Sequence, residues 1–300
     1  MSVFVFGEGM LELSAVRDGS ARVAYGGDAL NTAVYLARLG VAPQFVTALG
    51  DDPYSAWLKS EWRAEGLKLD HCLTVKGGKP GLYAISLDDR GERSFTYWRN
   101  DSAARAFFDC AQAASAIEAM TGASLLYLTG ITLSIFAPAH HARIFSIMEA
   151  AAAAGGKIAF DVNFRPRGWS DANDARRAVR AALDRSTIAF SSVEDWTLLF
   201  GAAGAEEIVS RIGLKRQSEI VVKEGARGCF FAAAGERGWV APEEVRAPLD
   251  TTGAGDNFNA AYFAARLRGA APREACAAGN RLAAETIMHA GAIKARIALQ

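Results

Sequence analysis

Six short runs in this chain are apolar at nearly every position and rich in β-branched and aromatic residues. They lack the alternation of polar and apolar residues that marks a strand with one face in water. Most are separated by segments with helical spacing, which is typical of strands joined by helices. We therefore predict an α/β protein with a parallel sheet covered by helices on both faces. The runs are residues 3–6, 44–48, 125–128, 157–161, 188–190 and 219–222.

The size and composition of the chain fit one large domain of this class. Its 300 residues are 51% hydrophobic and 22% charged, which supplies enough apolar material for a large core. No internal repeat or long linker divides it, so we predict a single domain over residues 1–300. The 33 lysine and arginine residues balance the 33 aspartate and glutamate residues. This balance predicts no nucleic-acid or membrane partner and a ligand bound at a local site.

The cysteines and the N-terminus predict a protein of the reducing cytoplasm. The four cysteines are isolated, which disfavours a disulfide framework or a structural zinc site. The first ten residues have no basic region ahead of their apolar stretch, so they predict a first strand and not a signal peptide. No charged residue lies between Glu118 and Arg143. The glycines and the proline in that stretch favour a buried strand flanked by loops over a membrane span.

Residues 73–100 have a different sequence pattern from the strand and helix segments of the predicted parallel sheet. Segments 82–87 and 93–98 are extended stretches joined by the polar turn 88–91, a pattern typical of a β-hairpin. A hairpin outside the parallel core could be a lid over a ligand site, and a surface ribbon or a subunit contact is an equally open interpretation.

The side chains of the second hairpin strand divide between two faces. Arg93, Phe95, Tyr97 and Arg99 share one face because side chains alternate along a strand, and Trp98 lies on the other. We expect Phe95 and Trp98 to be exposed on the hairpin, which favours a homo-oligomer.

The strongest functional signal is the segment Asp-Thr-Thr-Gly-Ala-Gly-Asp, which ends at Asp256. Residues 257–267 follow it with helical periodicity. Gly253 and Gly255, just before that helix, would leave its first amides bare, where the helix dipole attracts a phosphate. Asp256 at the same point could align a substrate hydroxyl. Alternatively, Asp256 is a helix N-cap and the glycines form a tight turn.

This segment resembles the C-terminal signature of the ribokinase-like (PfkB) sugar kinases. The sequence Gly-Gly-Asp-Ala-Leu-Asn at residues 26–31, followed by a helix running to Gly40, is similar to the N-terminal diglycine motif of that family. The resemblance implies a ribokinase-like three-layer α/β/α sandwich with a mainly parallel central sheet and a small β-rich lid. The lid is expected from inserted β segments at roughly 12–26 and 73–100.

The resemblance also implies roles for the residues of the two motifs. Asp256 is the expected catalytic base, which also contacts the substrate hydroxyl. Gly27 is expected to let the backbone approach the sugar, and Asn31 to support its hydroxyls. The expected anion hole consists of Gly253, Ala254, Gly255 and Asp256.

The hairpin resembles that of one group within the family, the 2-keto-3-deoxygluconate kinases. Residues 80–83, 91–100 and 7–13 carry this likeness, and it implies that Tyr83, Tyr97 and Arg99 bind the substrate. These side chains suit a sugar acid, because a guanidinium and phenolic hydroxyls can hold its carboxylate. On residue types alone, hairpin packing and a solvated arginine remain the alternative.

Three further segments carry residues that the resemblance assigns to the nucleotide. Arg165 is also expected to contact the substrate, because the resemblance places it at the junction of phosphates and sugar. On spacing alone, the first of these segments is an exposed loop after strand 157–161, and the second is a β-turn after strand 219–222. The expected ATP-site residues are Asn163, Arg165, Lys223, Gly225, Gly228, Gly253, Gly255 and Asn280.

Some positions depart from the family pattern. Ser192 and Asp195 stand where an Asn-x-x-Glu motif commonly organises magnesium-bound water, so the sequence leaves the metal-coordinating residues unassigned. Glu12 stands where many relatives carry aspartate. The chain has no G-x-x-x-x-G-K-[ST] phosphate loop, and Gly7-x-Gly9 lacks the third glycine of a dinucleotide-binding fingerprint.

Together these patterns predict a Mg²⁺- and ATP-dependent kinase. The expected reaction phosphorylates the terminal primary hydroxyl of 2-keto-3-deoxygluconate to give 2-keto-3-deoxy-6-phosphogluconate and ADP. A fructokinase or a kinase for another keto sugar acid is the first alternative. A non-catalytic sugar-acid sensor and a dinucleotide-dependent dehydrogenase are weaker ones.

Overall fold

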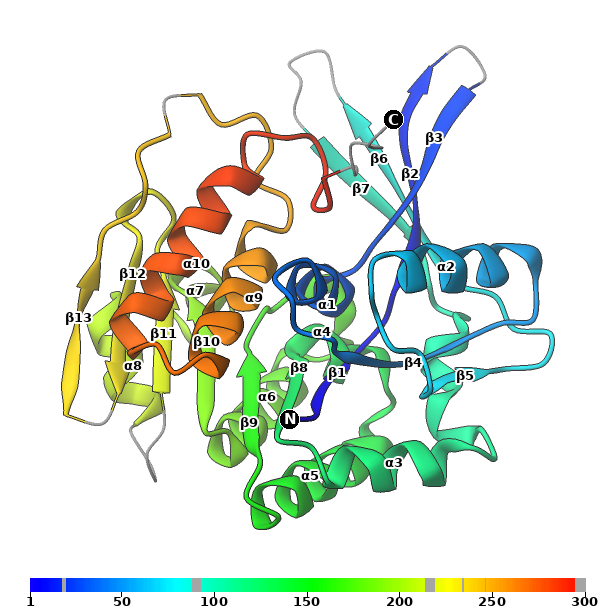
Figure 1. The fold of residues 1–300 in the computed structure, drawn as a ribbon, viewed down its shortest axis with the longest axis horizontal. Helices are drawn as coiled ribbons and strands as arrows, with labels where there is room; N and C mark the ends of the chain where they lie inside the picture. The colour runs from blue at the N-terminus through cyan, green and yellow to red at the C-terminus, as the bar shows by residue number, and fades with distance from the viewer. Residues whose placement is uncertain (18–19, 88–92, 214–218, 234, 246, 295–300) are drawn as a thin grey trace.

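A nine-stranded sheet forms the centre of the computed structural model (Figure 1). Seven of its neighbouring strands pair in parallel, in the order β11, β10, β9, β8, β1, β4 and β5. Strands β12 and β13 pair antiparallel and extend the sheet at the β11 edge. All six predicted strands belong to this sheet, so the predicted α/β class is confirmed. The structure describes residues 1–17, 20–87, 93–213, 219–233, 235–245 and 247–294. From edge to edge the strands are β13 (Glu236–Val240), β12 (Cys229–Ala233), β11 (Glu219–Lys223), β10 (Ile188–Ser192), β9 (Lys157–Asp161), β8 (Leu125–Thr129), β1 (Val3–Phe6), β4 (Gln44–Leu49) and β5 (Cys72–Thr74).

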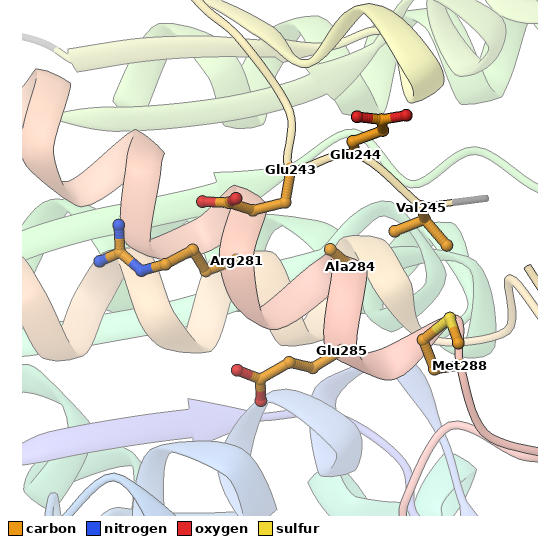
Figure 2. Close-up of a pocket in the computed structure, with 7 residues that line it drawn as sticks. All are labelled: Glu243, Glu244, Val245, Arg281, Ala284, Glu285 and Met288. Carbon is orange, nitrogen blue, oxygen red and sulfur yellow. The ribbon is translucent and has the colours of Figure 1, made fainter.

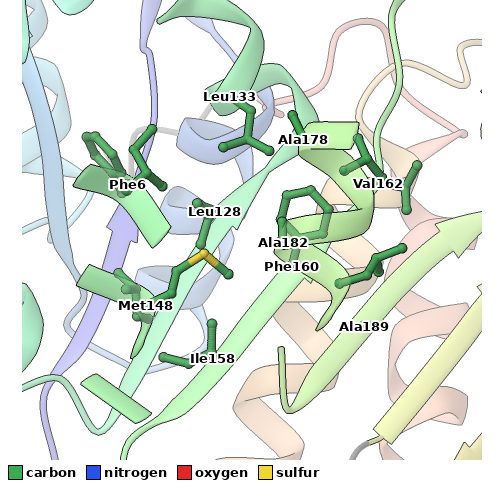
Figure 3. Packing of buried hydrophobic residues seen from close by; sticks show 14 of the residues in the cluster. Phe6, Leu128, Leu133, Met148, Ile158, Phe160, Val162, Ala178, Ala182 and Ala189 are labelled. Carbon is green, nitrogen blue, oxygen red and sulfur yellow. The ribbon is translucent and has the colours of Figure 1, made fainter. Parts of the chain in front are cut away.

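The apolar runs are explained by two cores, one on each face of the sheet. Along β1, Val3 and Val5 point into one core, whereas Phe4 and Phe6 point into the other. The first core is covered by α1 (Asp28–Arg38), α2 (Pro53–Ala64), α9 (Ala254–Leu267) and α10 (Pro272–Thr286). The second, seen in Figure 3, is covered by α3 (Ala113–Thr121), α4 (Gly130–Ile135), α5 (Pro138–Ala153), α6 (Ala172–Arg185), α7 (Val193–Phe200) and α8 (Ala205–Ile212).

A separate four-stranded sheet stands beside the large one, at the upper right of Figure 1. Its central strands β2 and β6 pair in parallel, and β3 and β7 pair antiparallel on the outside. Residues 73–74, which we expected with the hairpin, belong instead to β5, because β5 pairs with β4 at the edge of the large sheet. The turn predicted at 88–91 lies outside the described residues. The strands are β3 (Ser20–Gly26), β2 (Met10–Arg17), β6 (Gly81–Leu87) and β7 (Arg93–Trp98).

The side chains of the hairpin alternate between two faces as predicted, but the predicted exposure of Phe95 was wrong. Tyr83 of β6 lies directly opposite Tyr97 of β7. Phe95 is only partly exposed, because it packs against Tyr83 with ring centroids 6.3 Å apart. Trp98, on the opposite face, is 56% exposed as expected.

The uncharged stretch between Glu118 and Arg143 contains the buried strand β8, as predicted. A short helix, α4, follows the strand where a loop was expected, because the Thr129 hydroxyl caps it by accepting from the amide of Thr132 at 3.1 Å. No helix in the described ranges has the length and apolar character needed to cross a membrane.

Close packing of α10 on α9 fixes the helix that carries Asp256. Gly279 of α10 faces the ring of Phe258, and a Cβ at this glycine would lie 2.6 Å from the nearest ring carbon. Phe258 is buried between α10 and Phe190 of β10, whose ring centroid lies 6.5 Å from its own. The side chain of residue 279 therefore controls how closely the two helices approach.

We expect Gly279→Ala to destabilise the protein. Alanine favours a helix over glycine by about 1 kcal/mol, but overpacking a filled core costs about 1–3 kcal/mol, so the free energy of unfolding should fall. Urea denaturation measures it. Gly204→Ala is the control, because a Cβ at Gly204 would meet no atom within 4 Å. An increase in stability on Gly279→Ala would contradict this packing.

Candidate active site

The candidate site lies where carboxyl ends of the parallel strands meet the N-termini of α1 and α9. Hydrogen bonds join these elements. Thr129, which ends β8, donates to Asp28 of α1 at 2.5 Å. Lys223, which ends β11, lies 3.4 Å from the carbonyl oxygen of Gly255 in α9. Ligands of open α/β sheets bind in this position.

The N-terminus of α9 begins at a glycine in the left-handed region, Gly253, with φ 75°. Because its N-cap is glycine, no side chain caps the helix. The amide of Ala254 donates to the Thr251 carbonyl at 3.2 Å, which leaves the amides of Gly255 and Asp256 as the uncapped donors of the first turn. Asp256 itself is inside the helix, so the interpretation of Asp256 as an N-cap was wrong.

The carboxyl of Asp256 is held by α1. Asn31 donates its side-chain amide to Asp256 Oδ2 at 2.8 Å, and the Thr32 hydroxyl donates to the Asp256 carbonyl at 3.1 Å. Gly27 precedes this helix with φ 141°, and a Cβ there would lie 2.5 Å from the carbonyl oxygen of Glu8. Only glycine therefore lets α1 begin this close to β1.

Asp256 is only 9% exposed, and its surroundings change its acidity. Burial, followed by the negative charge of Asp28, raises its pKa to about 8, while the Asn31 hydrogen bond and Lys223 act in the opposite direction. At neutral pH the folded protein therefore keeps most of this carboxyl protonated. A proton acceptor with a pKa near the working pH suits general base catalysis of alcohol attack.

Behind Asp256 lies a buried polar network that the sequence did not reveal. Lys223 donates to Asp161 Oδ2 at 2.9 Å and to Asn259 Oδ1 at 3.2 Å. Asn259 in turn donates to Asp161 Oδ2 at 2.7 Å and to the Tyr127 hydroxyl at 3.0 Å. The available signal was the position of Asn259, three residues beyond Asp256 on the same helix. The network fixes Lys223 beside the start of α9.

On the small sheet, the structure brings together the three predicted sugar-acid residues. The rings of Tyr83 and Tyr97 lie 5.9 Å apart, and the Arg99 guanidinium lies 6.0 Å from the centre of the Tyr97 ring. Tyr83 donates to Glu12 Oε2 at 2.5 Å. Burial and the Glu12 charge raise the pKa of Tyr83, so its hydroxyl stays protonated as a donor.

Arg99 has a partner that sequence reasoning missed. Its guanidinium forms an ion pair with Glu8, whose side chain is almost fully buried. Glu8 immediately follows Gly7 at the carboxyl end of β1, and a Cβ at Gly81 would lie 2.8 Å from Glu8 Oε1. The ion pair therefore joins the base of the small sheet to the large sheet.

The predicted phosphate-side residues follow β9. Asn163 has φ 29°, a left-handed conformation rare outside glycine, and its amide donates to Asp28 Oδ2 at 3.3 Å. Arg165 pairs with Asp195 at 2.8 Å. Burial raises the pKa of Asp195, and Arg165 partly opposes the rise. Ser192 caps α7 by accepting from the Asp195 amide at 2.9 Å.

A model of the pfkB family carbohydrate kinases matches residues 2–298. The chain belongs to this family. It is 36% identical over 305 residues to the 2-dehydro-3-deoxygluconokinase of Escherichia coli strain K12, with 99% of this chain and 98% of that protein covered. It is also 36% identical to the enzyme of that name from Dickeya dadantii strain 3937 over 301 residues, which cover 97% and 96% of the two chains. A fructokinase of Escherichia coli is 29% identical over 257 residues, covering 85% of this chain and 81% of that one.

Solved structures share the fold. A PfkB protein from Polaromonas sp. JS666 has a TM-score of 0.82 at 27% identity, with 96% of each chain covered. A putative ribokinase II from Escherichia coli, in complex with ATP and Mg²⁺, has a TM-score of 0.82 at 22% identity, with 97% of this chain and 94% of that one covered. The predicted ribokinase-like architecture and pfkB kinase family are confirmed.

The remaining residues predicted to contact the nucleotide lie toward β12 and α10. Gly228 has φ 84°, and a Cβ there would lie 2.2 Å from the carbonyl oxygen of Val240. Asn280 donates to the carbonyls of Val240 and Ala241 at 3.1 and 2.8 Å, so both its N–H groups hold the backbone. Gly225, with φ 49°, begins a single 3₁₀ turn.

An open cavity of about 470 Å³ lies between residues 243–245 and α10 (Figure 2). Arg281 and Glu285 line it along the helix, and Met288 lines it just beyond the end of the helix. None of the predicted site residues lines it, although Asn280 holds the backbone of the segment that leads into it. A second hollow of about 500 Å³ lies beside Trp57, and none of its lining residues is a predicted site residue.

The side chains present fit a magnesium ion that arrives with phosphates. Within the described part of the chain, no three acidic, histidine or cysteine residues gather to hold a metal by themselves. Mg²⁺ typically keeps several waters and binds one or two carboxylates plus substrate phosphates. Asp195, beside Arg165, is a carboxylate of the kind that such a hydrated ion requires.

We expect Asp256→Asn to stabilise the fold increasingly as pH rises. An unfolded aspartate loses its proton near pH 4, whereas folded Asp256 keeps its proton to about pH 8. Between these values the folded state binds more protons, so this group lowers the free energy of unfolding as pH increases. Melting temperatures from pH 5 to pH 9 should show the gain. The control is Asp109→Asn, an exposed acid. A gain that is independent of pH would contradict the assignment.

Proposed function

We propose that this chain is an ATP-dependent kinase of 2-keto-3-deoxygluconate, which is also called 2-dehydro-3-deoxygluconate. It transfers the terminal phosphoryl group to the sugar's terminal primary hydroxyl and yields 2-keto-3-deoxy-6-phosphogluconate and ADP. The observation that carries the proposal is the placement of a buried acid, Asp256, at an uncapped helix N-terminus. The names of the two relatives at 36% identity support the same substrate.

Asp256 is the base of the reaction. The acceptor hydroxyl gives its proton to the carboxylate of Asp256 as its oxygen attacks the terminal phosphorus of ATP. Asn31 holds this carboxyl in place by its hydrogen bond at 2.8 Å. Because the pKa of Asp256 is raised to about 8, the ionised fraction and the rate increase with pH through this value.

The groups that receive the phosphates surround the start of α9. The amides of Gly255 and Asp256 face the transferring group and stabilise the charge that develops on it. Lys223 and Arg165 add positive charge on two sides, with Asn163 next to them. Bound Mg²⁺ neutralises phosphate charge, and Asp195 would hold it through water.

The small sheet supplies selectivity and a lid. Arg99 and the hydroxyls of Tyr83 and Tyr97 bind the carboxylate end of the sugar acid, which a neutral hexose lacks. Closure of the small sheet over the site excludes water, which would otherwise accept the phosphoryl group. The lid consists of β2, β3, β6 and β7, which belong to the same single domain as the large sheet.

A fructokinase activity is the second candidate within the family, since a fructokinase is 29% identical to this chain. The buried ion pair between Arg99 and Glu8 favours the sugar acid. A guanidinium fixed in one orientation suits a carboxylate and has no counterpart on fructose.

The experiment that tests the proposal is a coupled assay of ADP release with ATP and Mg²⁺. We expect a higher kcat/KM for 2-keto-3-deoxygluconate than for fructose. Arg99→Gln should lower kcat/KM for 2-keto-3-deoxygluconate at least tenfold by raising KM, because the guanidinium that pairs with the substrate carboxylate is lost. Arg22→Gln, an exposed arginine of the same sheet, is the control. Preference for fructose, or equal loss in both variants, would overturn the substrate assignment.

Asp256→Asn distinguishes a kinase from a non-catalytic sugar-acid sensor. The amide keeps the shape of the carboxyl but cannot accept the hydroxyl proton. We expect turnover to fall at least about a hundredfold while sugar-acid affinity, measured by calorimetry, is largely kept. Normal turnover in this variant would exclude Asp256 as the base.

A further inference from the structure

Asp28 is an acid within the diglycine motif to which neither the sequence nor the proposed function gives a role. It is the first residue of α1, directly after Gly27. Its Oδ2 atom accepts from the Thr129 hydroxyl at 2.5 Å and from the Asn163 amide at 3.3 Å. These partners come from the carboxyl end of β8 and from the segment after β9, so three separate elements converge on this carboxyl.

The same helix also holds the proposed base. Asn31 lies three residues after Asp28, about one helical turn along α1, and donates to Asp256 at 2.8 Å. A single helix N-terminus therefore presents one acid to the site and orients another. The donors from two other elements hold the Asp28 carboxyl in place, and each hydrogen bond favours its ionised form.

We propose that Asp28 is a positioning residue of the phosphoryl transfer: its fixed negative charge strengthens Asp256 as a base. The inference rests on the proposed function only for the role of Asp256. Asp28 acts through charge on its neighbour and takes no proton from the substrate itself.

The charged and titratable groups around Asp256 are consistent with this role. Burial is the largest cause of the raised pKa of Asp256, and Asp28 is the largest contribution from a charge. Asp161 adds to the rise and Lys223 opposes it. Among the described residues, Arg165 after β9, Tyr83 in β6 and Tyr127 in β8 also interact electrostatically with Asp256.

Asp28 is the better stabilised carboxylate of the two. Burial raises the pKa of Asp28 above the ordinary aspartate value, and the hydrogen bonds from Thr129 and the Ala29 amide, with the charges of Arg99 and Arg165, offset part of that rise. Tyr97 and Tyr127 are further titratable groups that interact electrostatically with Asp28. When only one of two close acids is ionised, the one with more donors carries the charge. Asp256 therefore keeps the proton until the pH rises.

The test compares the pH dependence of kcat/KM in the wild type and Asp28→Asn. Loss of the neighbouring charge should move the acid limb to lower pH by about one unit or more. The plateau at high pH should fall severalfold, because a weaker base removes the hydroxyl proton less readily. The control is Asp101→Asn, the same chemical change at an exposed acid, which should leave the limb in place. An unmoved limb in Asp28→Asn would overturn the inference.

A titration without substrate separates this inference from the proposed function. NMR of the ligand-free protein with ¹³C-carboxyl-labelled aspartate follows Asp256, whose signal is assigned by its loss in Asp256→Asn. Its midpoint should move to lower pH in Asp28→Asn whatever sugar the enzyme uses. Asp28→Glu retains the charge and should keep the wild-type midpoint. If Asp28→Glu moves the midpoint as far as Asp28→Asn, the effect is structural and the inference is wrong.

Discussion

The hydrogen bond between Asn31 and Asp256 joins residues 225 positions apart in the chain and places the two motifs in one site. It requires that α1 and α9 meet at their N-termini, and both helices begin after a glycine with positive φ. A Cβ at Gly253 would lie 2.5 Å from Ala292, as one at Gly27 would press on Glu8. Both helices pack into the same core on one face of the large sheet, so the position of one buried carboxyl depends on the packing of that core.

The cations of the site are already matched with acids before any ligand is present. A substrate anion therefore meets guanidinium and ammonium groups whose orientation is set, and only part of their charge is available to it. Such preorganisation limits the entropy lost on binding. The neutral net charge of the chain therefore says little about the site, where cations and acids are held close together. The pairs are Arg99 with Glu8, Arg165 with Asp195, and Lys223 with Asp161.

Much of the fold could be predicted because the strands of its large sheet are buried on both faces and several of its helices, such as α3, α7 and α8, end at glycine. Strand ends were harder: β10 continues through Ser192 because its backbone pairs with β11, which side-chain polarity does not reveal. Motif spacing and family resemblance named Asn31 and Asp256, which the structure brings together. Glu8, the partner of Arg99, and Asn259, the partner of Lys223, were not predicted, because the first contact crosses between sheets and the second lies behind Asp256.

The parallel pairing of β2 with β6 means that the small sheet is built from two pieces of chain with α1, α2 and two strands of the large sheet between them. The contact between the pieces is tight, since a Cβ at Gly26 would lie 2.2 Å from the Tyr83 hydroxyl. A sequence change in one piece at this contact therefore requires a matching change in the other. An exchange of one piece with a related gene would set a foreign tyrosine against an unmatched neighbour, so new sugar preferences in this lineage should arise through paired changes in both pieces.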